Sequence, residues 1–303
     1  MDSRFRLILI CCLSTVSIWS QSKIDTFLKP SDSINNSRRN AVVITETSLA
    51  SLTLVGLDQL WYADFERSKF KTIDDTDEWL QMDKLGHVFS SYQLGKIGAN
   101  ALHWAGVSKN DQLLYGATLG LGFLTAVELF DGYSEEWGFS WSDMAANATG
   151  TGLYIGQELL WDEQRIVMKY SFHQTQFANQ RPDKLGDGFL EEMLKDYNGQ
   201  TYWLSANVHS FFKESKIPKW INVAFGYGAE GMRTGRKENV DNLLITQNRR
   251  RQFYLSLDVD LSRIKTNSRV LRTVFDVLNV IKLPFPAIEF NKRNGAKLHY
   301  IYF

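Results

Sequence analysis

The stretch "WSDMAANATGTGLYIGQELLWDEQRIVMKYSF", residues 141–172, contains the change of rhythm that decides the fold. Before Gln164 the chain is rich in Leu, Ala and Gly in a helical pattern, and after it apolar and polar residues alternate as they do in strands. The sequence therefore predicts an α+β fold, in which a helical bundle precedes an antiparallel β-rich region. The predicted divisions are a signal peptide (1–20), a polar entry segment (21–39), a helical domain (40–164) and a β-rich region (165–303).

The first half of the chain predicts a bundle of about four helices. Each helix carries charged residues, and the longest uncharged runs are shorter than the roughly 20 residues that a membrane span needs. A compact bundle outside or against a membrane is therefore favoured over a four-span membrane protein. The expected helices are about 40–64, 84–105, 111–131 and 141–163.

Small residues four positions apart recur in these helices. Glycine weakens a helix interior, so its repeated use predicts that helix backbones approach one another closely. Such close packing is ordinary in a core and needs no function. The spaced residues are Gly95 with Ala99, Gly116 with Gly120, and Gly152 with Gly156.

The second half contains five predicted strands and a sixth candidate. In residues 252–261 every second residue is apolar, which predicts one dry face and one wet face. Residues 268–282, "SRVLRTVFDVLNVIK", predict an amphipathic helix capped by Ser268. We expect this helix to cover the sheet, with a position on a membrane surface as the alternative. The strand segments are 203–212, 221–230, 252–261, 287–291 and 297–303, with 165–172 as the sixth.

The composition excludes several classes of protein. With 303 residues, of which 44% are hydrophobic, the chain has enough apolar mass for a core and is not of the disordered class. Its 34 basic and 34 acidic residues give no overall charge that would attract nucleic acid, and its glycine-rich segments lack a phosphate-binding lysine, so no nucleotide is expected. Residues 249–303 hold 11 basic and 4 acidic residues, an excess that suits an anionic lipid surface, although a solvated basic face is the more common explanation.

The first 20 residues, "MDSRFRLILICCLSTVSIWS", have the layout of a secretory signal peptide. Arg4 and Arg6 precede an apolar run, and the expected cleavage lies between Ser20 and Gln21. Both cysteines of the chain lie in this segment, so the mature protein would have neither a disulfide nor a thiol nucleophile. The sequence therefore predicts an exported protein of the periplasm or outer membrane.

Three of the predicted helices each carry two polar residues on one face, in otherwise apolar and glycine-rich surroundings. Residues three or four positions apart lie on the same side of a helix. Because an unpaired carboxylate or imidazole is costly to bury, we expect the three pairs to meet one another. The pairs are Asp83 with His87, Glu128 with Asp131, and Asp143 with Asn147.

Two interpretations of these polar pairs remain open. The functional one is a metal site, with His87, Asp83, Glu128 and Asp143 as candidate ligands, or an acid and base pair that acts on a bound group. The structural one is a closed hydrogen-bond network that fixes the register of the bundle. Because His87 is the only imidazole among the pairs, we expect no cofactor, and a divalent metal is the alternative.

The motifs "DKLGH" (83–87), "ELFDGYSEEWGFS" (128–140) and "SWSDMAANATGTGLYIG" (140–156) resemble the YfiM-like family of predicted periplasmic lipoproteins, a domain of unknown function common in Bacteroidota. More distantly, they resemble the VanZ-like membrane proteins. The chain differs from these patterns by lacking a convincing lipobox and by lacking an arginine between Glu128 and Asp143. The resemblance covers residues 40–164, implies an envelope location, and offers no established reaction. The residues it implies are Asp83, Lys84, His87, Glu128, Asp131, Asp143, Asn147 and Gly150.

The leading hypothesis is a structural or partner-binding role at the outer membrane, with envelope proteins or a lipid surface as partners. The alternative is a metal-dependent hydrolase or transferase that uses the cluster around His87. One structural feature separates the two hypotheses, because a catalytic cluster opens into a pocket whereas a structural cluster is sealed.

Overall fold

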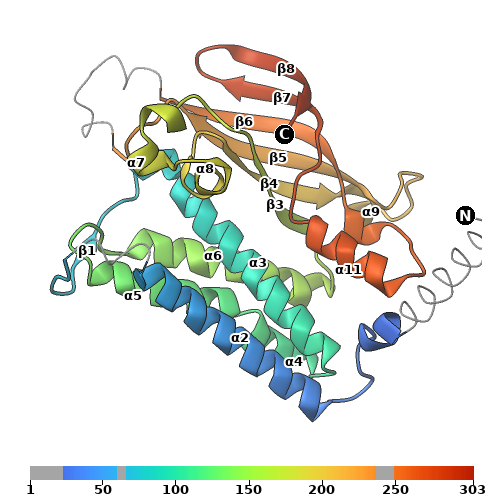
Figure 1. Ribbon diagram of the computed structural model, residues 1–303. Helices are drawn as coiled ribbons and strands as arrows, with labels where there is room; N and C mark the ends of the chain where they lie inside the picture. Colours follow the sequence, from blue (N-terminus) through green and yellow to red (C-terminus); the bar gives the residue numbers. More distant parts are fainter. Residues whose placement is uncertain (1–22, 60–65, 237–248) are drawn as a thin grey trace, which may run out of the picture.

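The computed structural model describes residues 23–59, 66–236 and 249–303, and it has a helical layer on one side and a curled antiparallel sheet on the other (Figure 1). The predicted α+β class is confirmed. The predicted signal peptide, with both cysteines, lies outside the described residues. The main helices are α2 (Asn36–Leu57), α3 (Met82–Trp104), α5 (Leu119–Gly132) and α6 (Trp141–Trp161), with α4 (Lys109–Asp111) and the π-helical turn η3 (Gln112–Gly116) ahead of α5.

Helix α2 begins four residues earlier than the sequence predicts. The side chain of Asn35 accepts a hydrogen bond from the backbone N–H of Arg38, and this cap satisfies one of the free donors at the helix start. The polar entry segment therefore contributes its last residues to the bundle.

Helix α3 is the centre of the bundle, because α5, η3 and α6 all pack against it. The close approach predicted from small residues is present at Gly95 and Gly120, where an added Cβ would collide with the backbone of Ala117, just after η3, and of Ser91 on α3. It is absent at Gly152 and Gly156, which have open space beside them. On α6 the close approach falls instead at Gly150, whose added Cβ would overlap a backbone carbonyl of α3.

Six strands form one antiparallel sheet in chain order, and each strand pairs with the next. Short helices lie in the connections: α7 (Pro182–Leu185) and α8 (Phe189–Lys195) before β4, α9 (Val208–Phe211) before β5, and α11 (Arg269–Leu278) before β7. The predicted strand over 203–212 ends at Asn207, because the Asn207 side chain accepts the N–H of Ser210 and starts α9. The strands are β3 (Ile166–Phe172), β4 (Gln200–Asn207), β5 (Ile221–Glu230), β6 (Arg250–Val259), β7 (Phe285–Asn291) and β8 (Gly295–Tyr302).

The sheet curls strongly, so that β8 returns towards β4. Tyr302 of β8 lies 5.9 Å from Trp203 of β4 between ring centroids, and its hydroxyl is 3.0 Å from the hydroxyl of Thr201. Strands four places apart in a flat sheet would be separated by about 19 Å. On the other edge, Tyr170 of β3 forms a parallel bridge with Ile281. One face of the sheet is therefore enclosed, and we call it the inner face.

The polarity of the sheet is the reverse of what is usual for a protein in water. The strand 252–261 alternates as predicted, but its polar side is buried on the inner face and Phe253 and Leu257 are exposed on the other side. The polar side chains are stable inside because they bind one another: Lys169 pairs with Asp258 at 2.8 Å, and Ser205 donates to the same carboxylate at 2.7 Å. We call the exposed apolar side the outer face.

Helix α11 does not cover the sheet in the way the sequence predicts. Ser268 caps it as expected, by accepting the N–H of Leu271. None of its residues is buried, however, and apolar side chains such as Val274 and Val277 remain exposed. Within the described part of the chain, the main packing partner of α11 is the short turn η5 (Leu261–Arg263).

Two helical segments, α2 and Lys109–Gly132, are long and apolar enough to cross a membrane by length and composition. Both segments contain charged residues, such as Glu46 and Glu128, so the prediction that the uncharged runs are shorter than a membrane span is unaffected. Core helices of soluble proteins meet the same criteria. Helix α2 differs from such a core helix, because Ile44 and Leu52 on it are exposed.

Candidate functional site

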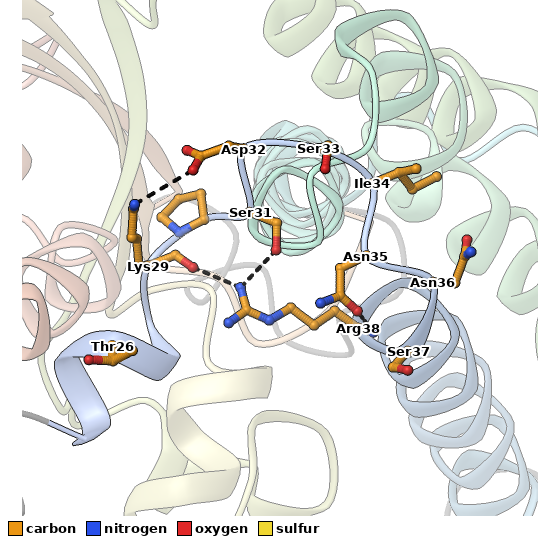
Figure 2. Close-up of a pocket in the computed structure, with 11 residues that line it drawn as sticks. Thr26, Lys29, Ser31, Asp32, Ser33, Ile34, Asn35, Asn36, Ser37 and Arg38 are labelled. Carbon is orange, nitrogen blue, oxygen red and sulfur yellow. Dashed lines mark hydrogen bonds and ion pairs between the residues drawn. The ribbon is translucent and has the colours of Figure 1, made fainter.

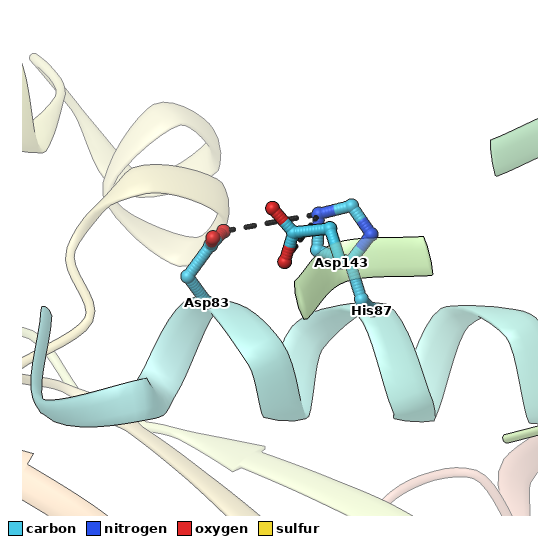
Figure 3. A group of neighbouring side chains, drawn as sticks. All are labelled: Asp83, His87 and Asp143. Atoms are coloured by element: carbon cyan, nitrogen blue, oxygen red, sulfur yellow. Dashed lines mark ion pairs between the residues drawn. The ribbon is translucent and has the colours of Figure 1, made fainter. Parts of the chain in front are cut away.

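The starts of α3 and α6 bring polar side chains together near the end of α5. Asp83 and His87 project from the first two turns of α3, and Asp143 reaches them from the first turn of α6 (Figure 3). Helix α6 starts at this point because Ser140 caps it by accepting the N–H of Asp143 at 3.1 Å. Glu128 joins them from α5. We call this group, together with Asp75, Lys84, Asn147 and Tyr197 that bind to it or to one another, the polar cluster.

Lys84 binds three carboxylates of the polar cluster. Its Nζ lies 2.6 Å from Asp75, 2.8 Å from Asp143 and 3.0 Å from Asp83. The Lys84 side chain is only 12% exposed, so these ion pairs are poorly screened by solvent.

His87 is held by one hydrogen bond and surrounded by three carboxylates. Its Nδ1 lies 3.0 Å from Oδ1 of Asn147, a fully buried side chain. Its Nε2 lies 3.7 Å from Glu128, 3.7 Å from Asp143 and 4.0 Å from Asp83. These three distances are too long for hydrogen bonds. A gap therefore separates the imidazole from the oxygens that surround it.

Other side chains fix the carboxylates in place. Asp75 accepts hydrogen bonds from the hydroxyls of Ser140 at 2.6 Å and Ser142 at 2.8 Å. Glu128 accepts the backbone N–H of Ser140 at 3.1 Å. Ser140 is thus both the cap of α6 and a bridge between two carboxylates. A short parallel pair of strands, β1 (Thr72–Ile73) and β2 (Phe139–Ser140), brings Asp75 to this position.

The β-rich region also contributes to the polar cluster. Tyr197, in the loop after α8, donates its hydroxyl hydrogen to Asp83 at 2.7 Å. Sequence reasoning missed Tyr197 and Asp75. Asp75 has a weak signal in the acidic run "DDTDE" at 74–78, whereas nothing near Tyr197 in the sequence indicates a partner more than 100 residues away.

A turn of left-handed backbone leads into α3. Trp79, Leu80 and Gln81 have φ angles of 47°, 53° and 66°, a region that side chains disfavour. The sheet layer holds this turn, since the Tyr227 hydroxyl donates to the Leu80 carbonyl and the Trp79 N–H donates to a carbonyl of the β5–β6 connection. The position of Asp83 is therefore set by contacts with the sheet as well as by α3.

The charges of the polar cluster change the proton affinity of its members. Burial raises the pKa of Glu128 to about 8, with Asp143 as the next cause. Burial and the charge of Asp83 raise the pKa of Asp143 to about 7. Burial opposes the charged form of His87, but Asp83, Asp143 and Glu128 outweigh it and raise the pKa of the imidazole. Near neutral pH the polar cluster therefore holds protons that isolated carboxyls would have released.

The carboxylates nearest to Lys84 behave differently. Burial opposes ionisation of Asp75, but hydrogen bonds from Lys84, Ser140 and Ser142 lower its pKa to about 2. Burial also opposes ionisation of Asp83, and the charges of His87 and Lys84 outweigh it, so its pKa is lowered. A carboxyl that keeps its proton beside one that does not is the usual arrangement of an acid and base pair.

The polar cluster opens into a pocket of about 450 Å³ between α3, α8 and the sheet. Asp83, His87, Tyr197 and Gln200 form its polar part. The cluster is therefore not sealed, although Glu128 and Asp143 lie behind the pocket wall. The remaining lining is Gly86, Phe89, Ser90, Leu124, Tyr170, Met193, Leu194, Tyr202, Val280 and Ile281, which is mostly apolar.

A second hollow of about 580 Å³ lies at the N-terminal loop (Figure 2). It is lined by residues 26–38 of one continuous segment, where Arg38 donates to the carbonyl of Lys29 at 2.7 Å and to Ser31 at 3.2 Å. It contains none of the polar cluster residues, and its shape follows from the turn of the loop.

The structure places six of the seven candidate side chains in mutual contact and leaves one at the margin. Asp131 is not an ion-pair partner of Lys84 or His87, and it acts on Glu128 through its charge, which helps to raise the pKa of that carboxyl. The Gly150 position serves the close packing of α6 on α3. The side chains in contact are Asp83, Lys84, His87, Glu128, Asp143 and Asn147.

Residues 73–156 match the model of a family described as predicted periplasmic lipoprotein (DUF2279). The match spans 84 of the 303 residues and includes all the cluster residues except Tyr197. The description fits an exported protein of the cell envelope whose activity is unknown. Neither the curated proteins nor the solved structures contain a match to the chain.

Proposed function

We propose that this protein rests against an envelope lipid surface through the outer face of its sheet. The observation that carries the proposal is a row of apolar residues in register across five strands: Leu204, Phe225, Leu255, Ile288 and Leu298. Phe225 is 59% exposed and Leu298 is 55% exposed. Soluble monomers rarely expose a continuous apolar patch of more than a few hundred Å². Contact with acyl chains would remove this surface from water.

The charges near the outer face favour anionic lipid as the partner. Of the four acidic residues in 249–303, Asp258, Asp260 and Glu289 are buried on the inner face. The bases Arg251 and Lys292 are exposed, so the charges of 249–303 that border the apolar row are mainly basic. Basic residues near a membrane surface each add about 1 kcal/mol of attraction to anionic lipids.

Vesicle flotation tests this proposal. We expect the mature chain to float with vesicles that contain phosphatidylglycerol and to float less with vesicles of phosphatidylcholine alone. Phe225→Asn and Leu298→Asn place polar groups in the apolar row and should reduce flotation at least fivefold. Leu160→Asn on α6 is the matched control, because Leu160 is even more exposed, at 75%, but lies outside the sheet. Wild-type protein that stays at the bottom of the gradient, or a Phe225→Asn variant that floats like the control, would refute lipid contact through the outer face.

The proposed location has its own test. A cleaved signal peptide predicts a mature N-terminus near Gln21, and binding to the outer membrane predicts partial release by high salt or carbonate. N-terminal sequencing that finds Met1, or fractionation that finds the chain in the cytoplasm, contradicts the location. We also propose that the chain is related to the YfiM-like family and, more distantly, to the VanZ-like family.

A second candidate function is a hydrolase or transferase that uses the polar cluster. The pocket favours it, because Asp83 and His87 face a cavity with apolar walls that suits a substrate with an acyl chain. In this function Glu128 would hold the proton to be transferred. Turnover of chromogenic acyl esters that is lost in His87→Ala and kept in Asp131→Asn would support it, and equal turnover in the two variants would exclude it.

A further inference from the structure

When His87 is neutral and the three carboxyls are ionised, the atoms around the gap beside His87 are all hydrogen-bond acceptors. Asn147 Oδ1 accepts the hydrogen of Nδ1, so the lone pair of the neutral imidazole lies on Nε2 and points at the gap. Carboxylate oxygens of Asp83, Glu128 and Asp143 approach the same point. Four such acceptors repel one another unless protons or a cation lie among them.

We infer that the polar cluster is a binding site for one divalent metal ion, with Nε2 of His87 and carboxylate oxygens of Asp83, Asp143 and Glu128 as ligands. The candidate ligand atoms of Asp83, His87 and Asp143 all lie within 4.8 Å of one another. The separations of 3.7 to 4.0 Å from Nε2 fit this arrangement, because atoms bound at about 2.1 Å to one ion lie about 3 to 4 Å apart. This inference is independent of the lipid proposal and replaces the expectation of no cofactor.

An unsatisfied polar atom at the gap supports the inference. Asp143 is buried, and its Oδ1 has no hydrogen-bond donor aligned on it within the described part of the chain. Lys84 Nζ is 2.8 Å from this oxygen but is not in line for a hydrogen bond. A cation at the gap would add a second favourable charge to the one that Lys84 supplies to this oxygen.

Lys84 and the proposed ion would contact different oxygens of Asp83 but share Oδ1 of Asp143. Lys84 binds Oδ2 of Asp83, whereas the gap is bordered by Oδ1 of the same residue, and Lys84 also binds Asp75, which lies away from His87. Four carboxyl groups share the single ammonium of Lys84, so Lys84 alone does not neutralise them when all four are ionised. The hydrogen bond from Nδ1 to Asn147 is the second contact that metal-binding histidines commonly make.

The ligand set indicates the chemical class of the ion. One nitrogen with three carboxylate oxygens suits Mn²⁺ or Zn²⁺ better than soft ions that prefer thiolates. The pocket provides an entry path, because Asp83 and His87 line it. A bound ion would keep an open position on the pocket side, where a ligand from the pocket could reach it.

Calorimetric titration of the chelator-treated mature chain with Mn²⁺ and, separately, Zn²⁺ tests the inference. We expect one ion per chain for at least one of these metals, and we expect elemental analysis after gel filtration to find the same ratio. His87→Ala and Asp143→Asn should each weaken binding at least tenfold. Asn147→Ala should weaken it as well, since it removes the partner of Nδ1. Asp131→Asn is the control, because Asp131 lies near Glu128 but is not a ligand, and it should bind like wild type.

The folding of each variant is checked by circular dichroism. Should His87→Ala fail to fold, Asp83→Asn replaces it, because Asp83 lies at the pocket and is the least buried ligand. A rise in melting temperature with added metal in wild type, and none in Asp143→Asn, would be a second sign of binding to the folded state. No saturable binding of either ion, or binding that survives in both His87→Ala and Asp143→Asn, overturns the inference. Vesicle flotation of His87→Ala should equal that of wild type, so the metal and lipid proposals can fail separately.

Discussion

Replacing Lys84 by methionine should destabilise the protein more than any other single change in a charged residue of the bundle. Methionine keeps most of the side-chain volume but leaves Asp75, Asp83 and Asp143 without their shared cation. The lowering of the Asp75 pKa from 3.8 to about 2 alone corresponds to about 2 kcal/mol of interaction with Lys84 and the two serines. With two further carboxylates left unpaired, we expect a loss of about 3 to 5 kcal/mol in the free energy of unfolding.

Urea unfolding, followed by circular dichroism in the presence of chelator, measures this loss. Lys109→Met is the matched control, because Lys109 pairs with Glu158 and Asp162 but is 44% exposed, and it should lose no more than about 1 kcal/mol. Adding Asp143→Asn to Lys84→Met should recover part of the loss, since one of the stranded charges is removed. The loss should be smaller at pH 6 than at pH 8, because Asp143, with a pKa of about 7, takes up a proton at the lower pH. A Lys84→Met variant that is as stable as Lys109→Met would refute the reasoning that these ion pairs are buried and coupled.

Three further predictions concern other parts of the molecule. Gly150→Ala should lower the free energy of unfolding by about 1 to 3 kcal/mol, because the added Cβ would collide with α3. Gly152→Ala has free space for its Cβ and should be neutral or stabilising by up to about 1 kcal/mol. Thermal melting compares the two variants. Burial lowers the pKa of Lys282 to about 8, so between pH 8 and 10 the unfolded chain binds more protons than the folded chain. The free energy of unfolding should therefore rise with pH over this range. Urea titrations of Lys282→Met should show a flatter dependence on pH. Tyr197→Phe removes a hydrogen bond to Asp83, so it should raise the pKa of this carboxyl and lower the free energy of unfolding by about 1 kcal/mol. NMR titration of the carboxyl measures the pKa. An unchanged pKa would mean that the hydrogen bond is not formed in solution.

The sequence predicts the elements of this fold well because periodicity reports local geometry. The alternation in 252–261 and the helical spacing of Asp83 with His87 both appear in the structure as expected. Periodicity does not reveal which face of a strand is buried, and the inner face of this sheet is polar because residues distant in the chain satisfy one another. The same limit explains why Tyr197 was missed, since its contact with Asp83 depends on how the two layers pack.

The pocket beside the polar cluster is built from two parts of the chain, of which one matches a known family model and the other does not. The region of family similarity, residues 73–156, supplies the charged side chains and the α3 and α5 walls, including Phe89 and Leu124. The opposite wall, with Tyr170, Tyr202 and Ile281, comes from residues beyond that region. A relative that shares only the matched segment would inherit the charges without this wall. Ligand selectivity could therefore diverge among such relatives while the chemistry of the charged residues stays constant.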